Sequence, residues 1–281
     1  MSIIKEITTI ASIAMPVAEH WQIRRCRYMP EGASAGRICL ASGIHGDELI
    51  GQLILHGIAQ RIQQHPEHLH GTVDIYPMLN PLGLDTSERM TPMMNYLDMN
   101  RSFPGTPNGT ALESMCHAIF TDMLGADLVL DLHASTRNKN ELYEVRIDSR
   151  SAARMIPQAY AFSPDLIWVY ADKYVLNATL TAALCAADTP AFILEMHEPR
   201  HKPYETANRI VDSIFCKMTE MGLWTGEAAP APAPDAQIPC VRTGDNICRI
   251  ACEKPGIYVP VEVIGKWVKA GDTLGDRKSV V

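Results

Sequence analysis

The sequence lacks two features that would define its surroundings or its partners. No apolar run approaches the roughly 20 residues that a membrane-spanning helix requires, and no long run of basic residues occurs. With 25 Lys and Arg against 32 Asp and Glu, the chain has a formal net charge of −7 at pH 7. The sequence therefore predicts neither a nucleic-acid nor a membrane partner, because a negatively charged surface does not attract nucleic acids or anionic lipids.

The cysteines lack the spacing of a redox or metal site. Eight are scattered along the chain without a Cys-x-x-Cys pair, and several lie in apolar runs such as 37–41, which is typical of small buried thiols. The apolar stretch 10–18 suits a signal peptide poorly, because Lys5 and Glu6 precede it and Pro16 interrupts it. We therefore expect a reduced, soluble, cytoplasmic protein.

What the sequence does have is enough apolar material for a sizeable core. Of its 281 residues, 47% are hydrophobic and 20% are charged, which excludes a disordered chain. Short β-branched runs alternate with longer amphipathic ones, a pattern typical of an α/β sheet covered by helices. The expected strands are 37–42, 72–78, 126–132 and 191–194, and the expected helices begin at Asp47 or cover 111–124, 178–187 and 204–222.

A Pro/Ala-rich segment divides the chain. Residues 226–237 alternate proline with alanine over much of their length, so they predict a stiff linker that is neither a helix nor a central strand. Residues 238–281 contain short strand-like segments broken by glycines, which indicate a small all-β segment. Because so small a core is marginal alone, we expect it to pack on the main domain, formed by residues 1–225.

The strongest chemical signal follows the strand expected at 37–42. His45 and Glu48 place an imidazole and a carboxylate three residues apart where open α/β sheets bind ligands. Zn²⁺ takes such nitrogen and oxygen ligands at about 2 Å, and His133 supplies a third ligand at the end of another strand. Alone, the first two would favour a capping box at a helix start with a chance histidine. All three predict one zinc ion per chain, although this donor set does not exclude iron or cobalt.

Five short motifs follow one another in the order seen in a known enzyme family. They are His45-Gly-Asp-Glu48, Asn80-Pro81, Asp98-Met-Asn-Arg-Ser-Phe-Pro-Gly105, Asp131-Leu-His133 and Pro190-Ala-Phe-Ile-Leu-Glu195. On these motifs, residues 35–200 resemble the succinylglutamate desuccinylases and aspartoacylases, the deacylase branch of the zinc-carboxypeptidase fold. The resemblance implies a three-layer α/β fold, with helices on both faces of a mixed sheet and a small C-terminal all-β segment.

The same resemblance assigns the central roles. It makes His45, Glu48 and His133 the zinc ligands and Glu195 the catalytic base. Amide hydrolysis at neutral pH needs an activated water, which zinc can supply, and a carboxylate that takes its proton. Glu198 lies only three residues away, and the glycine that usually follows the family's glutamate is a methionine here.

Several polar side chains are candidates for contact with the substrate. By resemblance, Arg89 stabilises the oxyanion of the reaction, while Asn100 and Arg101 bind a substrate carboxylate, for which the planar arginine fork is well suited. The alternative for each arginine is a solvated side chain. Asp98 either orients Arg101 or begins a turn.

Two further groups have less specific patterns. Arg137, Lys139 and Arg146 follow His133 and either contact an anionic substrate or belong to a solvated loop. The mixed spacing of His65, His68 and His70 favours a surface cluster over a site.

The resulting hypothesis is a zinc-dependent amidohydrolase that removes an acetyl, succinyl or similar group from a small anionic N-acyl amino acid or related amine. Two alternatives stay open: a metallocarboxypeptidase acting on small peptides, and a non-catalytic zinc-binding relative. The first depends on whether residues 238–281 restrict access to the site. The sequence also leaves a homo-oligomer open.

Overall fold

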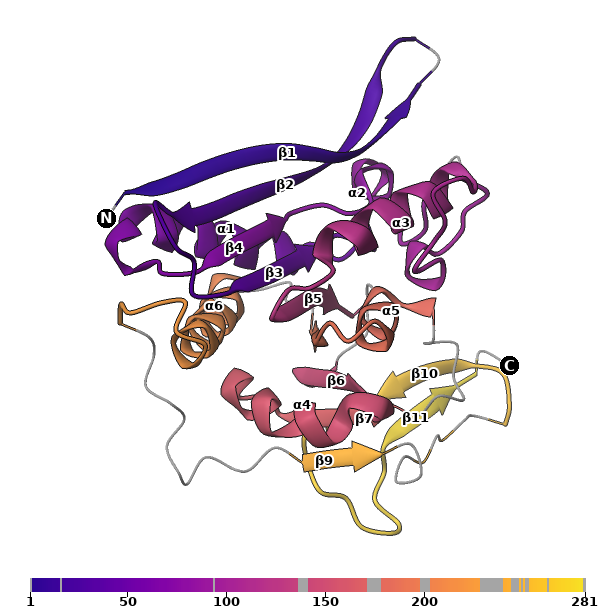
Figure 1. Ribbon diagram of the computed structural model, residues 1–281. Helices are drawn as coiled ribbons and strands as arrows, with labels where there is room; N and C mark the ends of the chain where they lie inside the picture. Colours follow the sequence, from indigo (N-terminus) through magenta and orange to yellow (C-terminus); the bar gives the residue numbers. More distant parts are fainter. Residues whose placement is uncertain are drawn as a thin grey trace.

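The computed structural model describes residues 2–15, 17–92, 94–135, 141–170, 178–197, 203–227, 240–243, 248, 250, 253–261 and 263–279. Its main feature is a nine-stranded mixed sheet in the order β1-β2-β4-β3-β5-β8-β6-β7-β9 (Figure 1). The strands are β1 (Ile3–Ala14), β2 (His20–Pro30), β3 (Arg37–Ser42), β4 (Thr72–Tyr76), β5 (Leu128–Ala134), β6 (Glu144–Asp148), β7 (Leu166–Tyr170), β8 (Ala191–Met196) and β9 (Cys240–Thr243). At the centre, β4, β3, β5 and β8 run parallel, whereas β6 is antiparallel to β8.

Helices cover both faces of this sheet, which confirms the predicted three-layer α/β architecture. They are α1 (Ile50–Gln64), α2 (Pro81–Thr86), α3 (Ala111–Met123), α4 (Ala152–Ala159), α5 (Leu180–Ala186) and α6 (Pro203–Glu220), with short 3₁₀ turns η1 (Pro66–His68), η2 (Met99–Arg101), η3 (Ser149–Ser151) and η4 (Tyr160–Phe162). One hydrophobic core joins the sheet to α1, α4 and α6, and a second joins it to α3 and α5. No helix among the described residues is long and apolar enough to cross a membrane.

The central strands read as continuous apolar runs because both of their faces are covered. In β3, Ile38 and Leu40 belong to the core under α1 and α6, while Cys39 and Ala41 belong to the core under α3 and α5. This alternation follows from the two-residue period of a strand. The buried Cys39 is a free thiol, as the sequence predicts.

The fold differs from the sequence prediction in several details, two of which lie in its N-terminal part. The first helix begins at Ile50, not at Asp47, because a turn closed by the N–H of Glu48 on the carbonyl of His45 precedes it. The N-terminal hairpin β1–β2 was not predicted. Its alternation of side chains is broken by an irregularity between Thr9 and Ala11, and most of β1 is exposed or half-exposed.

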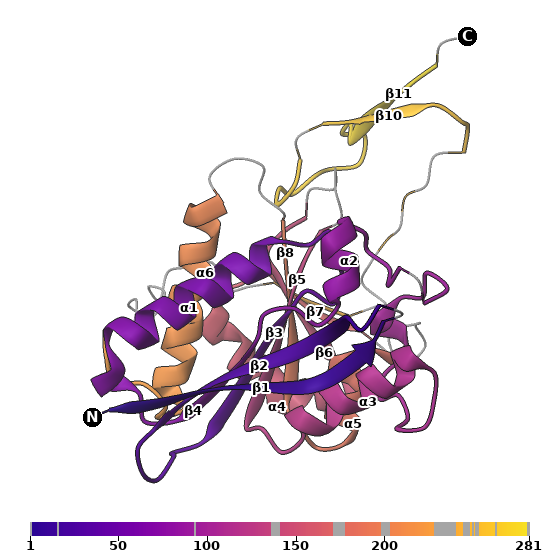
Figure 2. The same cartoon turned by 90° about the horizontal axis from the view of Figure 1, so that it is seen from above.

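The C-terminal residues contribute strands to two sheets. β9 extends the main sheet beside β7, and β10 (Ile257–Pro260) pairs with β11 (Gly275–Lys278) in a separate antiparallel pair (Figure 2). The predicted small C-terminal β segment is therefore present. Most of the predicted linker, 228–237, lies outside the described residues, and the division of the chain into domains stays a prediction.

A buried aspartate holds the N-terminal half of the sheet together. Asp74 on β4 is fully buried and accepts hydrogen bonds from Arg27 on β2, at 2.7 Å for both oxygens, and from Arg37 on β3, at 2.8 Å. A third arginine, Arg25, has its Nε 3.7 Å from the same carboxylate. Since arginines from two strands bind one anion on a third strand, this carboxylate fixes how β2, β4 and β3 pack against one another.

The substitution Asp74→Asn should destabilise the protein strongly, because it leaves partly buried guanidinium groups without their counter-ion. We expect the free energy of unfolding to fall by about 3 kcal/mol, measured by urea denaturation. As a matched control, Asp212→Asn removes the partner of Arg61 in a more exposed pair and should cost less than about 1 kcal/mol. Equal effects of the two substitutions would contradict this account.

Candidate active site

The candidate site lies at the carboxyl ends of three neighbouring parallel strands. His45 follows β3, His133 belongs to β5, and Glu195 belongs to β8, where it lies directly beside His133 in the strand register. The turn that carries His45 is held in place by Gly46. A Cβ atom at Gly46 would lie 1.8 Å from the carbonyl carbon of Gly83 in α2, so only glycine fits this close approach.

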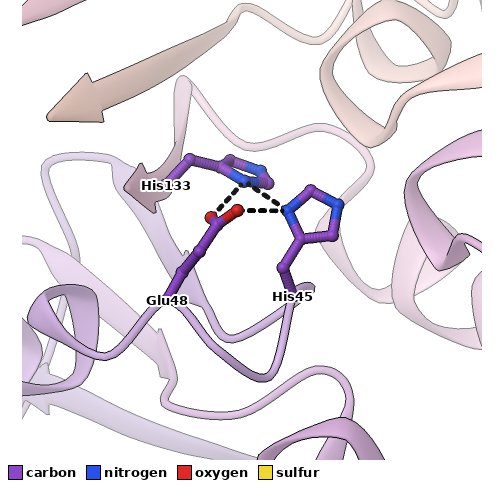
Figure 3. Close-up of side chains that lie close together, drawn as sticks. All are labelled: His45, Glu48 and His133. Carbon is purple, nitrogen blue, oxygen red and sulfur yellow. Dashed lines mark hydrogen bonds and ion pairs between the residues drawn. The ribbon is translucent and has the colours of Figure 1, made fainter. Parts of the chain in front are cut away.

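His45, Glu48 and His133 meet in a compact group (Figure 3). Nδ1 of His45 is 2.7 Å from one carboxylate oxygen of Glu48, and Nδ1 of His133 is 3.0 Å from the other. The two Nδ1 atoms are 3.2 Å apart. All three residues are buried, and the backbone N–H of Ala134 donates to Glu48 at 3.0 Å. The structure therefore brings together the three side chains that the sequence predicts as ligands.

The far nitrogen of each imidazole also faces a carboxylate. Nε2 of His133 is 3.0 Å from Asp131, and Nε2 of His45 is 3.2 Å from Asp98. Metal-binding histidines usually have such a partner on their second nitrogen, which fixes the orientation of the ring. Asp131 lies two residues before His133 on β5, and residues at this spacing share a face of a strand. That spacing could have revealed the role of Asp131 in the sequence.

The polar groups are arranged to hold a cation. Two N–H groups whose nitrogens lie 3.2 Å apart would repel each other, whereas a metal ion would satisfy both nitrogen lone pairs and the carboxylate of Glu48. The electrostatics favour positive charge as well. Burial works to lower the pKa of His133, but Asp131 and Glu48 outweigh it and raise that pKa well above its usual value. His45, Glu48 and His133 therefore fit a divalent ion, and two imidazoles with one carboxylate are a zinc donor set.

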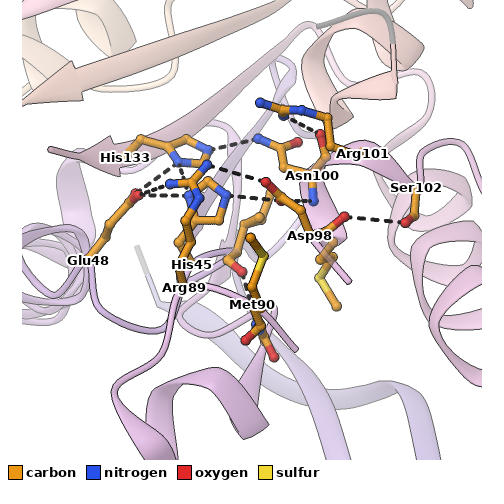
Figure 4. A network of polar contacts seen from close by, with 12 residues as sticks. His45, Glu48, Arg89, Met90, Asp98, Asn100, Arg101, Ser102 and His133 are labelled. Carbon is orange, nitrogen blue, oxygen red and sulfur yellow. Dashed lines mark hydrogen bonds and ion pairs between the residues drawn. The ribbon is translucent and has the colours of Figure 1, made fainter. Parts of the chain in front are cut away.

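Arg89 and Asp98 border this group (Figure 4). Arg89 donates to Glu48 at 3.1 Å and to Asp98 at 3.4 Å. Asp98 also accepts from the backbone N–H of Asn100 at 2.9 Å and so begins the turn η2, one of the two roles expected for it. Its contact with His45 was not predicted. The carboxylates of Glu48, Asp98 and Asp131 therefore each contact at least one of the two imidazoles. The guanidinium of Arg89 pairs with two of them, Glu48 and Asp98. One guanidinium does not neutralise three carboxylates, so negative charge is in excess.

Asn100 and Arg101 also lie at the site. The side chain of Asn100 is buried, with its Nδ2 atom 3.4 Å from Nε2 of His133, and it accepts a hydrogen bond from the backbone N–H of Leu180 at 3.0 Å. Arg101 donates to the backbone carbonyl of Asn100 at 2.6 Å. These contacts fix the position of η2 against α5, and the predicted contact of both residues with a substrate carboxylate stays a prediction.

Glu195 is buried and has an ion-pair partner. One of its oxygens is 2.9 Å from Nη1 of Arg146, and Arg146 also donates to Glu144 at 2.7 Å and stacks on Trp168. Burial raises the pKa of Glu195 although Arg146 opposes the shift. The interpretation of Arg146 as a solvated loop residue is wrong, because it lies on β6, a strand that was not predicted. Arg137, Lys139 and Glu198 lie outside the described residues.

The substitution Asp131→Asn should weaken binding of zinc at the predicted ligands without removing one of them, because the ring of His133 loses its charged partner. We expect the affinity for zinc to fall about 10- to 100-fold, measured by competition with a chelator of known affinity. The control is Asp148→Asn, which changes a buried carboxylate that pairs with Arg150 on another part of the sheet. Unchanged zinc affinity in the Asp131 variant would mean that this carboxylate does not support a metal ligand.

Several solved structures share this fold. A succinylglutamate desuccinylase/aspartoacylase from Rhodobacter sphaeroides is 21% identical, with a TM-score of 0.81 over 99% of this chain and 83% of that one. The product-bound ectoine utilization protein EutE (DoeB) from Ruegeria pomeroyi is 18% identical, with a TM-score of 0.80 over the same shares. A metallo-carboxypeptidase from Burkholderia cenocepacia is 12% identical, with a TM-score of 0.61 over 77% of this chain and 64% of that one. At these identities the likeness concerns the fold.

Sequence comparison gives a more specific result. Over 100 residues the chain is 38% identical to the N-alpha-acetyl-L-2,4-diaminobutyric acid deacetylase of Halomonas elongata, a match that covers 35% of this chain and 28% of that protein. The family model described as the succinylglutamate desuccinylase/aspartoacylase catalytic domain matches residues 34–211. Because this match includes more than half of the chain and all of the converging side chains above, the chain belongs to the succinylglutamate desuccinylase/aspartoacylase family.

Proposed function

We propose that this chain is a zinc-dependent amidohydrolase that releases an acyl group from a small N-acyl amino acid or related amine. The observation that carries the proposal is the convergence of His45, Glu48 and His133 beside a buried carboxylate, Glu195, on the next strand. The family supports a deacylase, and the Halomonas relative makes an N-acetylated diamino acid the first substrate to test.

The three converging side chains would hold the metal ion. Bound there, zinc would lower the pKa of a coordinated water towards about 7 and polarise the carbonyl of the scissile amide. His45 and His133 are oriented for this role by Asp98 and Asp131, and Glu48 by the backbone of Ala134. These contacts fix the positions of the three side chains.

Glu195 is proposed as the general base and acid. Its carboxylate takes a proton from the attacking water and delivers it to the nitrogen of the leaving amine, so that the amide bond breaks to give a carboxylic acid and a free amine. Arg146 holds one carboxylate oxygen at 2.9 Å, which fixes the orientation of the group. The burial of Glu195 and its raised pKa suit a group that must hold a proton during the reaction.

Arg89 is proposed to stabilise the negative charge that develops on the carbonyl oxygen. Its side chain is 31% exposed and reaches the edge of the ligand group. A guanidinium carries five N–H donors, so its contacts with Glu48 and Asp98 leave donors for a reacting oxygen. Arg101 and Asn100 follow in η2 and are proposed to bind the carboxylate of the substrate.

We further propose that residues 1–225 form the catalytic unit and that 238–281 pack on it and restrict access to the site. Two contacts support this arrangement: β9 pairs with β7, and Gly265 approaches Leu142, just before β6, so closely that a Cβ atom would lie 3.3 Å from that side chain. Intact protein should then hydrolyse N-acetyl, N-succinyl or N-formyl amino acids in preference to longer peptides. Efficient release of C-terminal residues from long peptides would favour a carboxypeptidase instead.

Removal of the metal should abolish hydrolysis. Protein treated with a chelator, and verified to be metal-free by mass spectrometry, should lose turnover of N-acetyl and N-succinyl amino acids because no activated water remains. Addition of one equivalent of zinc should restore it, whereas magnesium should not, since Mg²⁺ prefers an all-oxygen octahedral site. Full activity of metal-free protein would end the proposal.

The substitution Glu195→Gln should remove the proton carrier while keeping the shape of the side chain. We expect kcat to fall by about 10²- to 10⁴-fold with zinc content unchanged, measured by steady-state kinetics and metal analysis on the same preparation. The exposed Glu19→Gln serves as a control and should retain wild-type kcat. If the Glu195 variant turned over substrate at the wild-type rate, the base would have to be another group.

A further inference from the structure

A second group of side chains of the types that bind metal ions lies at the opposite end of α1 from Glu48. It consists of His65, Glu67 and His68. His65 ends α1 and begins the 3₁₀ turn η1, and His68 is the last residue of that turn. The backbone N–H of His68 donates to the carbonyl of His65 at 3.2 Å, and this bond closes the turn between the two histidines. Glu67 stands between them: its carboxylate oxygen is 3.7 Å from Nδ1 of His65 and 3.5 Å from Nε2 of His68.

The donor atoms of this group already lie close together. One ligand atom from each of His65, Glu67 and His68 lies within 4.8 Å of the other two, as is also true of the group in the proposed active site. The two imidazole rings have centroids 6.1 Å apart. The side chains are 54%, 52% and 37% exposed, in that order, so an ion can reach them from solvent and small rotations can adjust their distances.

His68 is held in an orientation that suits a ligand. Its Nδ1 atom is 3.4 Å from the hydroxyl of Thr225, its ring lies edge-on to Trp224, and its backbone carbonyl accepts from the N–H of Thr225 at 3.0 Å. Nε2 is thereby directed to Glu67. A hydrogen bond to the second nitrogen is the usual support of a metal-binding histidine.

The electrostatic potential around His65, Glu67 and His68 also favours a cation. The carbonyl end of a helix carries partial negative charge, and α1 contributes 15 residues of aligned peptide dipoles ending at His65. The positive charge of Arg61 in the last turn is neutralised by Asp212, 2.6 Å away. Glu67 adds a full negative charge to the group.

We propose that His65, Glu67 and His68 form a second site for a divalent transition-metal ion, separate from the proposed active site. Two imidazoles and a carboxylate are ligands that zinc accepts, with water in the remaining position. The sites are separated by the length of α1, about 22 Å at 1.5 Å per residue. An ion there links the end of α1 to the chain that follows α6, because Thr225 and Trp224 contact His68.

The test compares zinc binding by two double variants. His65→Ala/His68→Ala removes the proposed ligands, and His20→Ala/His56→Ala removes two exposed imidazoles elsewhere. After equilibrium dialysis against the same free zinc, the first variant should hold one zinc per chain fewer than wild type, and the control should match wild type. The first variant should also lose part of the zinc-induced rise in Tm while keeping its hydrolytic activity.

The comparison is a difference between proteins, so it holds whatever the site at His45 binds. Equal zinc content of wild type and His65→Ala/His68→Ala would overturn the proposal, and so would an equal loss in the control, which would indicate non-specific binding to surface histidines. If the double variant does not fold, Glu67→Gln at an exposed position keeps both imidazoles. It should weaken the second zinc equivalent alone, and unchanged binding would again contradict the site.

Discussion

The parallel alignment of β3, β5 and β8 is the constraint on which the site depends. It brings three strand ends to one edge of the sheet, so that His45, His133 and Glu195 meet although they are far apart in the chain. The strands are held in this order by side chains buried on both faces. A slip of one residue in β5 would turn His133 to the opposite face and separate it from Glu48.

The negative charges of the site are neutralised to different extents in its two parts. At Glu195 the chain supplies its own counter-ion, Arg146, and buries the pair. Around the imidazoles, Glu48, Asp98 and Asp131 carry more negative charge than Arg89 neutralises. Buried carboxylates without sufficient counter-charge destabilise a fold. Their presence here is understandable if an ion completes the site, so stability and metal binding are expected to depend on each other.

The sequence predicted the four central parallel strands, β3, β4, β5 and β8, and the group of three proposed ligands. Strand 37–42 was predicted with its bounds, because a short apolar run bounded by polar and glycine residues is a strong local signal. The pairing of Arg146 with Glu195 could not be predicted in this way. β6 enters the sheet antiparallel between β8 and β7, and no local pattern specifies which distant strands become neighbours. The hairpin β1–β2 was missed because its bulge interrupts the two-residue period.

The short ladder between β6 and β8 has a consequence for the outer part of the sheet. Glu144 and Glu195 lie directly opposite each other in this ladder, a placement in which two like charges would push the strands apart. Arg146 forms ion pairs with both carboxylates, so its positive charge offsets their repulsion and links the two strands. The position of β6, which has β7 and β9 on its far side, therefore depends in part on a carboxylate proposed to carry out catalysis. The pairing of β6 with β8 and the proposed catalysis thus involve the same side chain.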